Sequence, residues 1–122
     1  HAAHHNGADR DPQIRQRIAD AWIGLRVMRW NALRVLGHGA EGALPREALG
    51  SKLSWSTWHK QLGELAMDVL GAEAEVIAAA PYALTPLQET FLFSRADTIY
   101  AGSSEIQKNI IAARALGLPR GS

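Results

Sequence analysis

The residue types best suited to bind or react lie together in residues 99–107, IYAGSSEIQ. An apolar helix is expected to end at Gly102 and a second helix to begin at Ser104, because Ser104 and Gln107 have the spacing of a capping box. Free backbone N–H groups and serine hydroxyls then meet at a helix start, where the helix dipole also favours negative charge. The segment is a candidate site for a phosphate or pyrophosphate. Two serines that only cap a helix are the alternative.

Metal and disulfide chemistry find little support in the residue types. His1, His4 and His5 lie in an unpatterned terminus without a second group of ligands. The chain has no cysteine, which excludes disulfides and thiolate ligands. We predict no metal site.

The composition is that of one globular domain. Its 122 residues fit a single domain, and 47% of them are apolar, which is enough for a core. Thirteen basic and twelve acidic side chains give a net charge of +1, too little for a strong field toward nucleic acid. No apolar run approaches the roughly 20 residues that cross a bilayer, and no signal-peptide pattern opens the chain. We therefore expect a cytoplasmic protein with no nucleic-acid partner and no membrane span.

Helix-forming residues dominate the elements that must position the candidate site. The chain has 21 alanines and 14 leucines, and no strand-like alternation of apolar and polar residues. Asp11 and Pro12 give a capping residue followed by a first-turn proline, and they predict a helix over 12–37. Residues 1–10 are expected to be a flexible tail or loop, and 11–120 one all-α domain.

Three more helices follow from capping and stop signals. A second helix is expected over 45–70, before a glycine. A third begins at Pro86, because Thr85 and Gln88 form a capping box around it. A fourth is expected over 104–116.

The apolar side chains predict more than one neighbour for these helices. Val27 and Trp30 project away from the core stripe of the first helix, and Leu49 and Leu53 lie off that of the second. The third helix is apolar around most of its circumference. We therefore predict that the domain does not remain a monomer. The core stripe of the first helix is expected to comprise Ile14, Ile18, Ala21, Trp22, Leu25, Met28, Ala32 and Leu36.

Two segments resemble the C-terminal domain of the acyl-CoA dehydrogenase family. Residues 99–120, IYAGSSEIQKNIIAARALGLPR, look like the closing signature of the family. Residues 51–71, SKLSWSTWHKQLGELAMDVLG, are similar to the long helix and glycine turn that precede it. The resemblance begins at about Asp11 and implies an up-down helical bundle, incomplete at its N-terminal side. It also implies FAD held between this domain, other domains and a neighbouring subunit.

The resemblance assigns roles to the residues of the first candidate site. Gly102 and Ser103 match the turn that approaches the phosphates of FAD, and Glu105 matches the polar position after it. Tyr100 and Ala101 match positions beside the reactive carbons of the acyl chain. In many members residue 101 is the glutamate that removes the α-proton. Here that position is alanine, so the sequence offers no catalytic residue.

A second cofactor contact is implied near the end of the second helix. Asp68 and Gly71 match a segment that reaches the FAD of the partner subunit in the family. Many members have glutamine at the first position and another glycine where this chain has Ala72. A carboxylate would repel a pyrophosphate, and a methyl group keeps the backbone away from it. Asp68 as a solvated residue, on a polar face with Lys60 and Glu64, is the alternative.

The implied function is flavin-dependent α,β-dehydrogenation of an acyl-CoA thioester, in fatty acid or lipid metabolism. The resemblance implies a homo- or hetero-oligomer, dimer or tetramer, with electron-transfer flavoprotein as the electron acceptor. Two alternatives remain: a related acyl-CoA oxidase-type flavoprotein, and a non-catalytic partner subunit that lacks the base. The chain alone is expected to be inactive.

Overall fold

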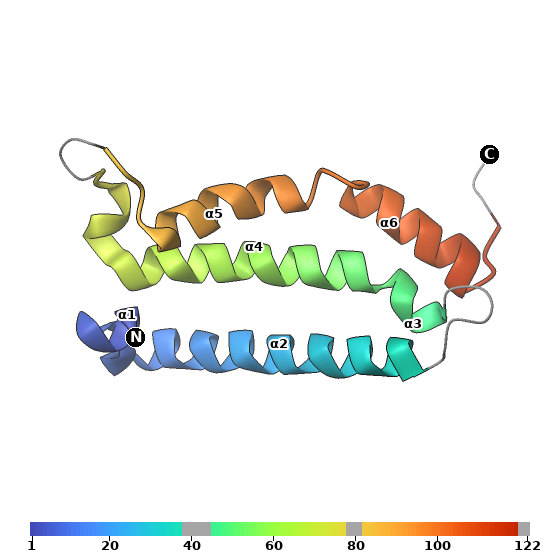
Figure 1. Cartoon of the computed structure of the whole chain (residues 1–122), viewed down its shortest axis with the longest axis horizontal. Coiled ribbons are helices and arrows are strands. Elements are labelled where there is room, and N and C mark those ends of the chain that lie inside the picture. Colours follow the sequence, from blue (N-terminus) through green and yellow to red (C-terminus); the bar gives the residue numbers. More distant parts are fainter. Residues whose placement is uncertain (38–44, 78–81, 120–122) are drawn as a thin grey trace.

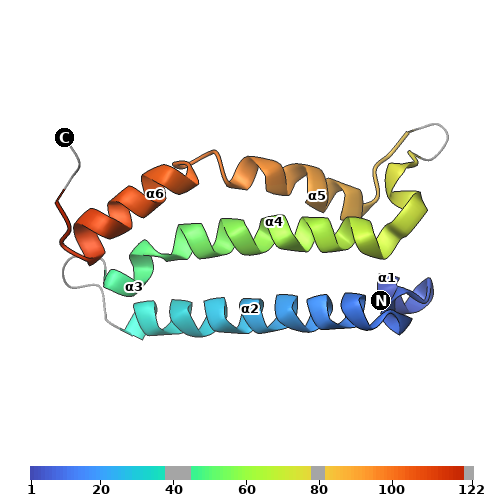
Figure 2. The same cartoon turned by 180° about the vertical axis from the view of Figure 1, so that it is seen from behind.

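The computed structural model describes residues 1–37, 45–77 and 82–119, and every regular element within these ranges is helical. The long helices α2 (Pro12–Gly37) and α4 (Ser51–Leu70) run antiparallel. Figures 1 and 2 show α4 in the middle, with α2 on one side and both α5 (Pro86–Asp97) and α6 (Ser104–Ile110) on the other. The predicted all-α, up-down architecture is confirmed.

Helix α2 begins where the sequence predicts. The carboxylate of Asp11 accepts a hydrogen bond of 2.7 Å from the backbone N–H of Gln13, and Pro12 occupies the first helical position. Residues 12–37 therefore form one helix, as expected.

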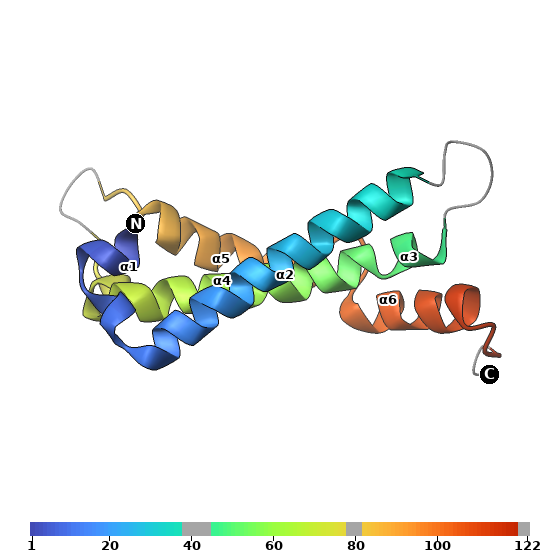
Figure 3. The same cartoon turned by 90° about the horizontal axis from the view of Figure 1, so that it is seen from below.

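The crossing of α2 over α4 depends on a glycine and a tryptophan (Figure 3). A Cβ atom on Gly24 would lie 2.6 Å from Cδ1 of Trp58, so the indole lies directly on the α2 backbone. The indole Nε1–H of Trp58 donates to the carbonyl of Ala21 over 2.8 Å. This contact satisfies the polar end of a large aromatic side chain and fixes the register of the two helices.

The expected helix over 45–70 is divided into α3 (Arg46–Leu49) and α4, with Gly50 between them. The side-chain amide of Asn31 on α2 donates to the carbonyl of Glu47 over 3.1 Å. Glycine also lowers helix stability by about 1 kcal/mol relative to alanine. The prediction of one continuous helix missed this break because the bond to Asn31 is tertiary.

Helices α4 and α5 approach each other closely at two small residues, Gly63 and Ser94. A Cβ atom on Gly63 would lie 2.5 Å from Oγ of Ser94 and 3.0 Å from Cα of Phe91. Helix α5 starts with the predicted capping box, in which the backbone N–H of Gln88 donates to Thr85 Oγ1 over 3.3 Å. The small residues at 63 and 94 therefore set the distance between the two backbones.

Residues 1–10 differ from the expected tail or loop. They form α1 (Ala2–His5) and a 3₁₀ turn (Ala8–Arg10). Ala3 is buried against Leu65 and Val69 of α4, and the side-chain amide of Asn6 donates to the Val69 carbonyl over 2.6 Å. The segment folds because it buries apolar surface at the end of α4, which periodicity over ten residues does not predict.

Large apolar side chains cover the outer faces of several helices. On α2, Trp22 is 60% exposed and Trp30 is 58% exposed, with the guanidinium of Arg26 within 6 Å of both rings. Phe93 on α5 is 61% exposed, so the prediction that neighbours bury this helix on several sides is not met within the described chain. Of the predicted core stripe of α2, Ile14, Ala21 and Met28 are only half-buried, and its other members are exposed: Ile18, Trp22, Leu25, Ala32 and Leu36.

The last helix is shorter than expected. Helix α5 ends at Asp97, before the predicted turn, and α6 ends at Ile110. A π-helical segment (Ile111–Ala115) continues α6, and Gly117 then adopts a φ of +68°. The helix therefore ends close to the predicted glycine. The change from α-helical to π-helical hydrogen bonds before it was not predicted from the sequence.

Candidate functional site

The turn between α5 and α6 carries most of the predicted site residues. Ala101 and Gly102 follow each other with φ of +55° and +97°, in the left-handed region that costs a non-glycine residue about 1–2 kcal/mol. The side-chain amide of Gln107 donates to the Ala101 carbonyl over 2.9 Å and holds the turn against α6. A Cβ atom on Gly102 would lie 2.8 Å from the same amide nitrogen. The positive φ at position 102 therefore favours glycine, and a side chain there would also displace the amide of Gln107.

The start of α6 differs from the prediction. Ser103, not Ser104, is the N-cap residue, and its side chain makes no capping bond to the helix. The amide of Gln107 bonds to Ala101 instead of the N-cap backbone, so the predicted capping box of Ser104 and Gln107 is wrong. The tight left-handed turn brings the Ala101 carbonyl within reach of Gln107, and this bond competes with the cap.

Donors at the start of α6 hold a carboxylate. Hydrogen bonding with its own backbone N–H and with the hydroxyl of Ser103, together with the nearby charge of Lys108, holds the pKa of Glu105 below its usual value of 4.5, against a smaller upward effect of desolvation. The first turn of α6 therefore already stabilises an anionic oxygen, as its helix dipole predicts.

A buried carboxylate lies directly before this turn. Asp97, the last residue of α5, is fully buried, and its Oδ1 accepts a hydrogen bond of 2.6 Å from the hydroxyl of Tyr100. Nδ1–H of His59 on α4 donates to Oδ2, and Nζ of Lys52 on α4 donates to the backbone carbonyl of Asp97. We call Lys52, His59, Asp97 and Tyr100 the Asp97 cluster. It ties the end of α5 to α4.

The charges of the Asp97 cluster support one another. Burial by itself would raise the pKa of Asp97, but the hydrogen bonds from Tyr100 and His59 and the charges of His59 and Lys52 outweigh it. The pKa of Asp97 therefore lies below its usual value of 3.8, and the group is an anion at neutral pH. The same bond to Asp97, aided by desolvation, raises the pKa of Tyr100 above 10.0. Tyr100 therefore remains a neutral hydrogen-bond donor.

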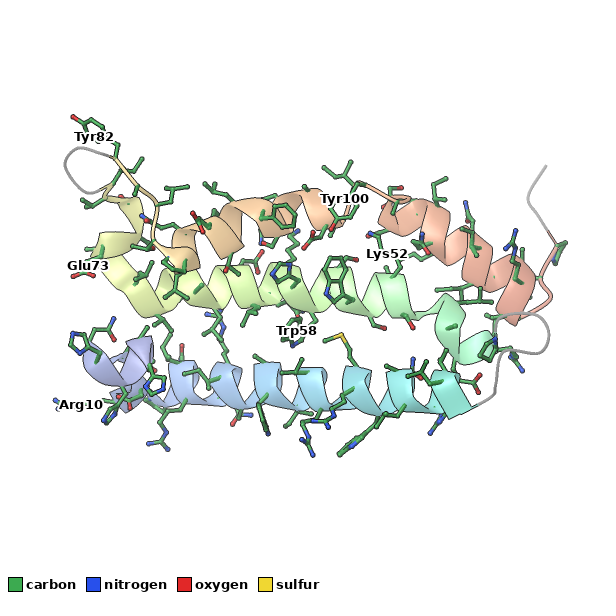
Figure 4. All side chains as sticks on the ribbon, viewed as in Figure 1. Arg10, Lys52, Trp58, Glu73, Tyr82 and Tyr100 are labelled. Atoms are coloured by element: carbon green, nitrogen blue, oxygen red, sulfur yellow. The ribbon has the colours of Figure 1, made fainter. Side chains whose placement is uncertain are left out.

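Aromatic side chains of α4 lie beside His59 of the cluster. The ring of His59 stacks with those of Trp55 and Trp58, with centroid distances of 5.7 and 6.2 Å. Nζ of Lys52 lies 5.4 Å from the centroid of the Tyr100 ring. Figure 4 shows Lys52 reaching from α4 toward Tyr100 at the end of α5. Tyr100 remains 44% exposed, so part of its ring is open to a ligand.

The second predicted cofactor segment lies at the other end of α4. Asp68 forms an ion pair with Arg17 of α2, and half of its side chain is exposed. Gly71 caps α4 with a φ of +59°, and a Cβ atom there would contact nothing within 4 Å. Sixteen residues of α4, about 24 Å of helix, separate Asp68 from Lys52 of the Asp97 cluster. The structure therefore does not bring the two predicted cofactor segments together within one chain.

Residues on the predicted polar face of α4, which holds Lys60, Glu64 and Asp68, contact the neighbouring helices. Nη1 of Arg95 on α5 lies 3.0 Å from the carboxylate of Glu64, and its Nη2 donates to the Lys60 carbonyl over 2.7 Å. Arg95 also covers the Phe91 ring at 4.7 Å. With Asp68 paired to Arg17, the acidic side chains of this face mainly join α4 to its neighbours.

Sequence reasoning missed Lys52, His59 and Asp97. The spacing of Asp97 and Tyr100, three residues apart near the end of a helix, is the one sequence signal that points to their hydrogen bond. The contacts with His59 and Lys52 depend on how α5 lies along α4, which the close approach of Gly63 and Ser94 fixes. That register is a tertiary property.

Metal-ligating groups and membrane-spanning helices were searched for in the described residues. Within 1–37, 45–77 and 82–119, histidine and acidic side chains form no group of three that could hold a metal ion. In the same part of the chain, no helix combines the length and apolar character needed to cross a bilayer.

Comparisons with known proteins identify a matching family model and two similar proteins. A family model described as "Acyl-CoA dehydrogenase, C-terminal domain" matches residues 4–116. Acyl-CoA dehydrogenase IpdE1 of Mycobacterium tuberculosis is 48% identical over 118 residues, which cover 97% of this chain and 30% of that protein. The IpdE1 of Mycolicibacterium smegmatis is 47% identical and covers 97% of this chain and 29% of its own length. No solved structure matches the chain.

The fold and the site define an antiparallel helical domain with a tight glycine-serine turn between its last two α-helices, α5 and α6. The chain belongs to the acyl-CoA dehydrogenase family, as its C-terminal domain. It spans about 30% of the length of the curated relatives that it matches.

Proposed function

We propose that this chain works as part of an FAD-dependent acyl-CoA dehydrogenase. In this role it contributes part of the flavin site, part of the acyl site and a subunit interface. The observation that carries the proposal is the α5–α6 turn, because Tyr100 to Glu105 combine a partly exposed tyrosine, a glycine in the left-handed conformation and anion-binding donors. Family membership supports the same reading.

Gly102, Ser103 and the backbone N–H of Glu105 are the proposed contacts to the phosphates of FAD. The donors that hold the Glu105 carboxylate suit the oxygens of a phosphate, so the residues present fit the group. Gly102 has no side chain, and a ligand can approach its backbone closely. The Glu105 side chain would turn outward in that complex, because its charge repels a phosphate. When bound, FAD supplies the hydride acceptor for α,β-dehydrogenation of the acyl group.

Asp68 and Gly71 are the proposed contacts to the FAD of a partner subunit. Their distance from the α5–α6 turn, about 24 Å along α4, fits contacts with two different flavins. The charge of Arg17 offsets that of Asp68 and reduces its repulsion of a phosphate. Gly71 leaves its surroundings open for a ligand.

Tyr100 and Ala101 are the proposed contacts to the acyl group. The methyl group of Ala101 cannot remove a proton, and Glu105 is engaged by the donors of its own turn. The base that removes the α-proton is therefore proposed to come from outside residues 1–122, either from another part of the same protein or from a complementary subunit. Ala101 also favours a second candidate, in which the protein is a non-catalytic partner subunit.

The remaining partners are proposals drawn from the family. We propose an acyl-CoA substrate of lipid metabolism, electron-transfer flavoprotein as electron acceptor and a cytoplasmic location. The exposed apolar faces of α2 and α5 support a homo- or hetero-oligomer, dimer or tetramer. The absence of cysteine is compatible with a reducing compartment.

The test is anaerobic reduction of the full-length protein. The protein is purified with its natural partner subunit, if it has one, and its flavin absorbance is recorded while acyl-CoA thioesters are added. The proposal predicts bleaching of bound flavin. A protein that retains no flavin, or a flavin that no acyl-CoA bleaches while a chemical reductant does, would contradict it.

Variants of the same protein test the origin of the base. Replacement by glutamine of the glutamate nearest the acyl α-carbon, in the chain or its partner, should abolish bleaching. Ala101→Glu in that background should restore part of it, because a base must lie within about 3 Å of its proton. Full bleaching after every such glutamate is removed would refute the external base.

A further inference from the structure

The Asp97 cluster has a geometry that packing alone does not require. A carboxylate with no exposed surface loses the solvation of water, and an apolar side chain of similar size is often at least as stable in such a place. Asp97 is nevertheless satisfied on both oxygens, by Tyr100 and by His59, and its backbone carbonyl accepts from Lys52. The partners come from both α4 and the α5–α6 turn. The carboxylate therefore fixes the turn relative to α4.

Tyr100 is the member of the cluster that faces a ligand. Its hydroxyl is anchored on Asp97, and the ammonium group of Lys52 lies 5.4 Å from its ring centroid. These two contacts fix both the direction of the hydroxyl and the tilt of the ring. The residue is still 44% exposed, directly before the left-handed pair Ala101 and Gly102.

Local bonds also hold the backbone after α5: the backbone N–H groups of Ile99 and Tyr100 donate to the Ala96 carbonyl over 2.9 and 3.1 Å. The side-chain hydroxyl of Thr98 bonds only to the Arg95 carbonyl within the same helix, over 3.3 Å. The Gln107 amide holds the other side of the turn, at Ala101. The Tyr100 side chain is therefore held by Asp97 and Lys52, its backbone by the bond to Ala96, and the next residue, Ala101, by the bond from Gln107 of α6.

We propose that Asp97 is a positioning residue for the acyl site, and that it holds the Tyr100 ring and the α5–α6 turn in the orientation that receives the acyl group. His59 and Lys52 hold Asp97 in turn. The acyl part of this inference rests on the proposed function, whereas the placement of the turn by Asp97 does not.

The experiment uses the full-length flavoprotein with three single variants and the double variant Asp97→Asn/Tyr100→Phe. Asp97→Asn keeps the size of the side chain and removes its charge. Tyr100→Phe removes only the hydroxyl and leaves the buried carboxylate paired with His59, so it decides the question even if Asp97→Asn does not fold. Gln88→Ala is the matched control, because Gln88 is a buried polar residue at the opposite end of α5. Hydrogen exchange of peptides covering residues 98–103 and steady-state kinetics with an acyl-CoA substrate are measured for each.

Both cluster variants should increase hydrogen exchange in 98–103 and raise the KM for acyl-CoA about five- to tenfold, with kcat changed less than about twofold. The double variant should be no worse than the more affected single variant, because the two groups share one hydrogen bond. Gln88→Ala should lower the melting temperature and leave KM unchanged.

The outcomes separate this inference from the proposed function. Unchanged exchange in 98–103, or an unchanged KM in an active protein, would overturn the positioning role of Asp97. A wild-type protein whose flavin is not reduced by any acyl-CoA would overturn the proposed function, while increased exchange in the variants would still support the placement of the turn by Asp97.

Discussion

The substitution Gly63→Ala tests directly how closely α4 and α5 approach each other. The added Cβ atom would lie 2.5 Å from Oγ of Ser94 and 3.0 Å from Cα of Phe91. Rotation of Ser94 relieves the first contact, but Phe91 Cα belongs to the backbone of α5. The two helices must therefore move apart, at the place where Ser94 is fully buried.

The expected loss follows from two opposing terms. Overpacking of a buried contact costs about 1–3 kcal/mol, and the backbone obstacle places Gly63→Ala near the upper end, at about 2–3 kcal/mol. Alanine in place of a mid-helix glycine recovers about 1 kcal/mol. We therefore expect the free energy of unfolding to fall by about 1–2 kcal/mol.

Urea unfolding of the 122-residue chain, followed by far-ultraviolet circular dichroism, measures this loss. Gly50→Ala is the matched control, because its φ of −82° suits alanine and a Cβ atom there contacts nothing within 4 Å. It should be neutral or stabilising. Ser94→Ala should recover part of the loss in the Gly63→Ala background. A Gly63→Ala variant as stable as wild type would refute the close approach of the helices.

Three further predictions follow from other contacts. Gln88→Ala should destabilise the chain by about 2 kcal/mol in urea, because the buried amide caps α5 and donates to the carbonyls of Ala74 and Val76; a loss below about 0.5 kcal/mol would contradict this. The pKa of Asp97 is lower in the folded chain than its usual 3.8, so the unfolded chain binds that proton first and stability is lost as the pH falls below about 4. Asp97→Asn should flatten this acid-side loss in unfolding curves from about pH 5 to about pH 2, whereas an identical slope would contradict the prediction. Sedimentation of the chain at high micromolar concentration should show association through apolar faces that include Trp30 and Phe93, and a monomer would count against it.

Local signals predicted the helices where their ends are local. Asp11 and Pro12 start α2, and the Thr85–Gln88 box starts α5, because each cap involves residues within one turn. The break at Gly50 and the failed cap at Ser104 both depend on side chains that reach across the fold or the turn, from Asn31 and Gln107. Such bonds compete with the local helix propensity of the chain, and the spacing of apolar residues in the sequence does not predict them.

The candidate site also has features that the sequence predicts and features that depend on the assembled fold. The turn from Tyr100 to Glu105 was predictable because a helix end, a glycine and a helix start are sequence features. The left-handed conformation of Ala101 was not, because alanine rarely adopts it. The link from Asp97 to His59 spans 38 residues and exists only in the assembled α4–α5 pair. Trp30 was predicted to lie away from the core stripe of α2, and it is exposed. Trp22 was predicted to lie in the core but is also exposed, because the helical period alone does not determine which side of α2 faces α4.

The most direct test of the central claim is an experimental structure of the full-length protein with FAD bound. We expect oxygens of the FAD pyrophosphate within about 3 Å of backbone or hydroxyl donors in residues 102–105, with the Glu105 carboxylate displaced from its present bonds. Tyr100 should stand beside the flavin with its hydroxyl still on Asp97. A bound flavin whose pyrophosphate lies away from this turn, with Glu105 still folded onto Ser103, would contradict the account.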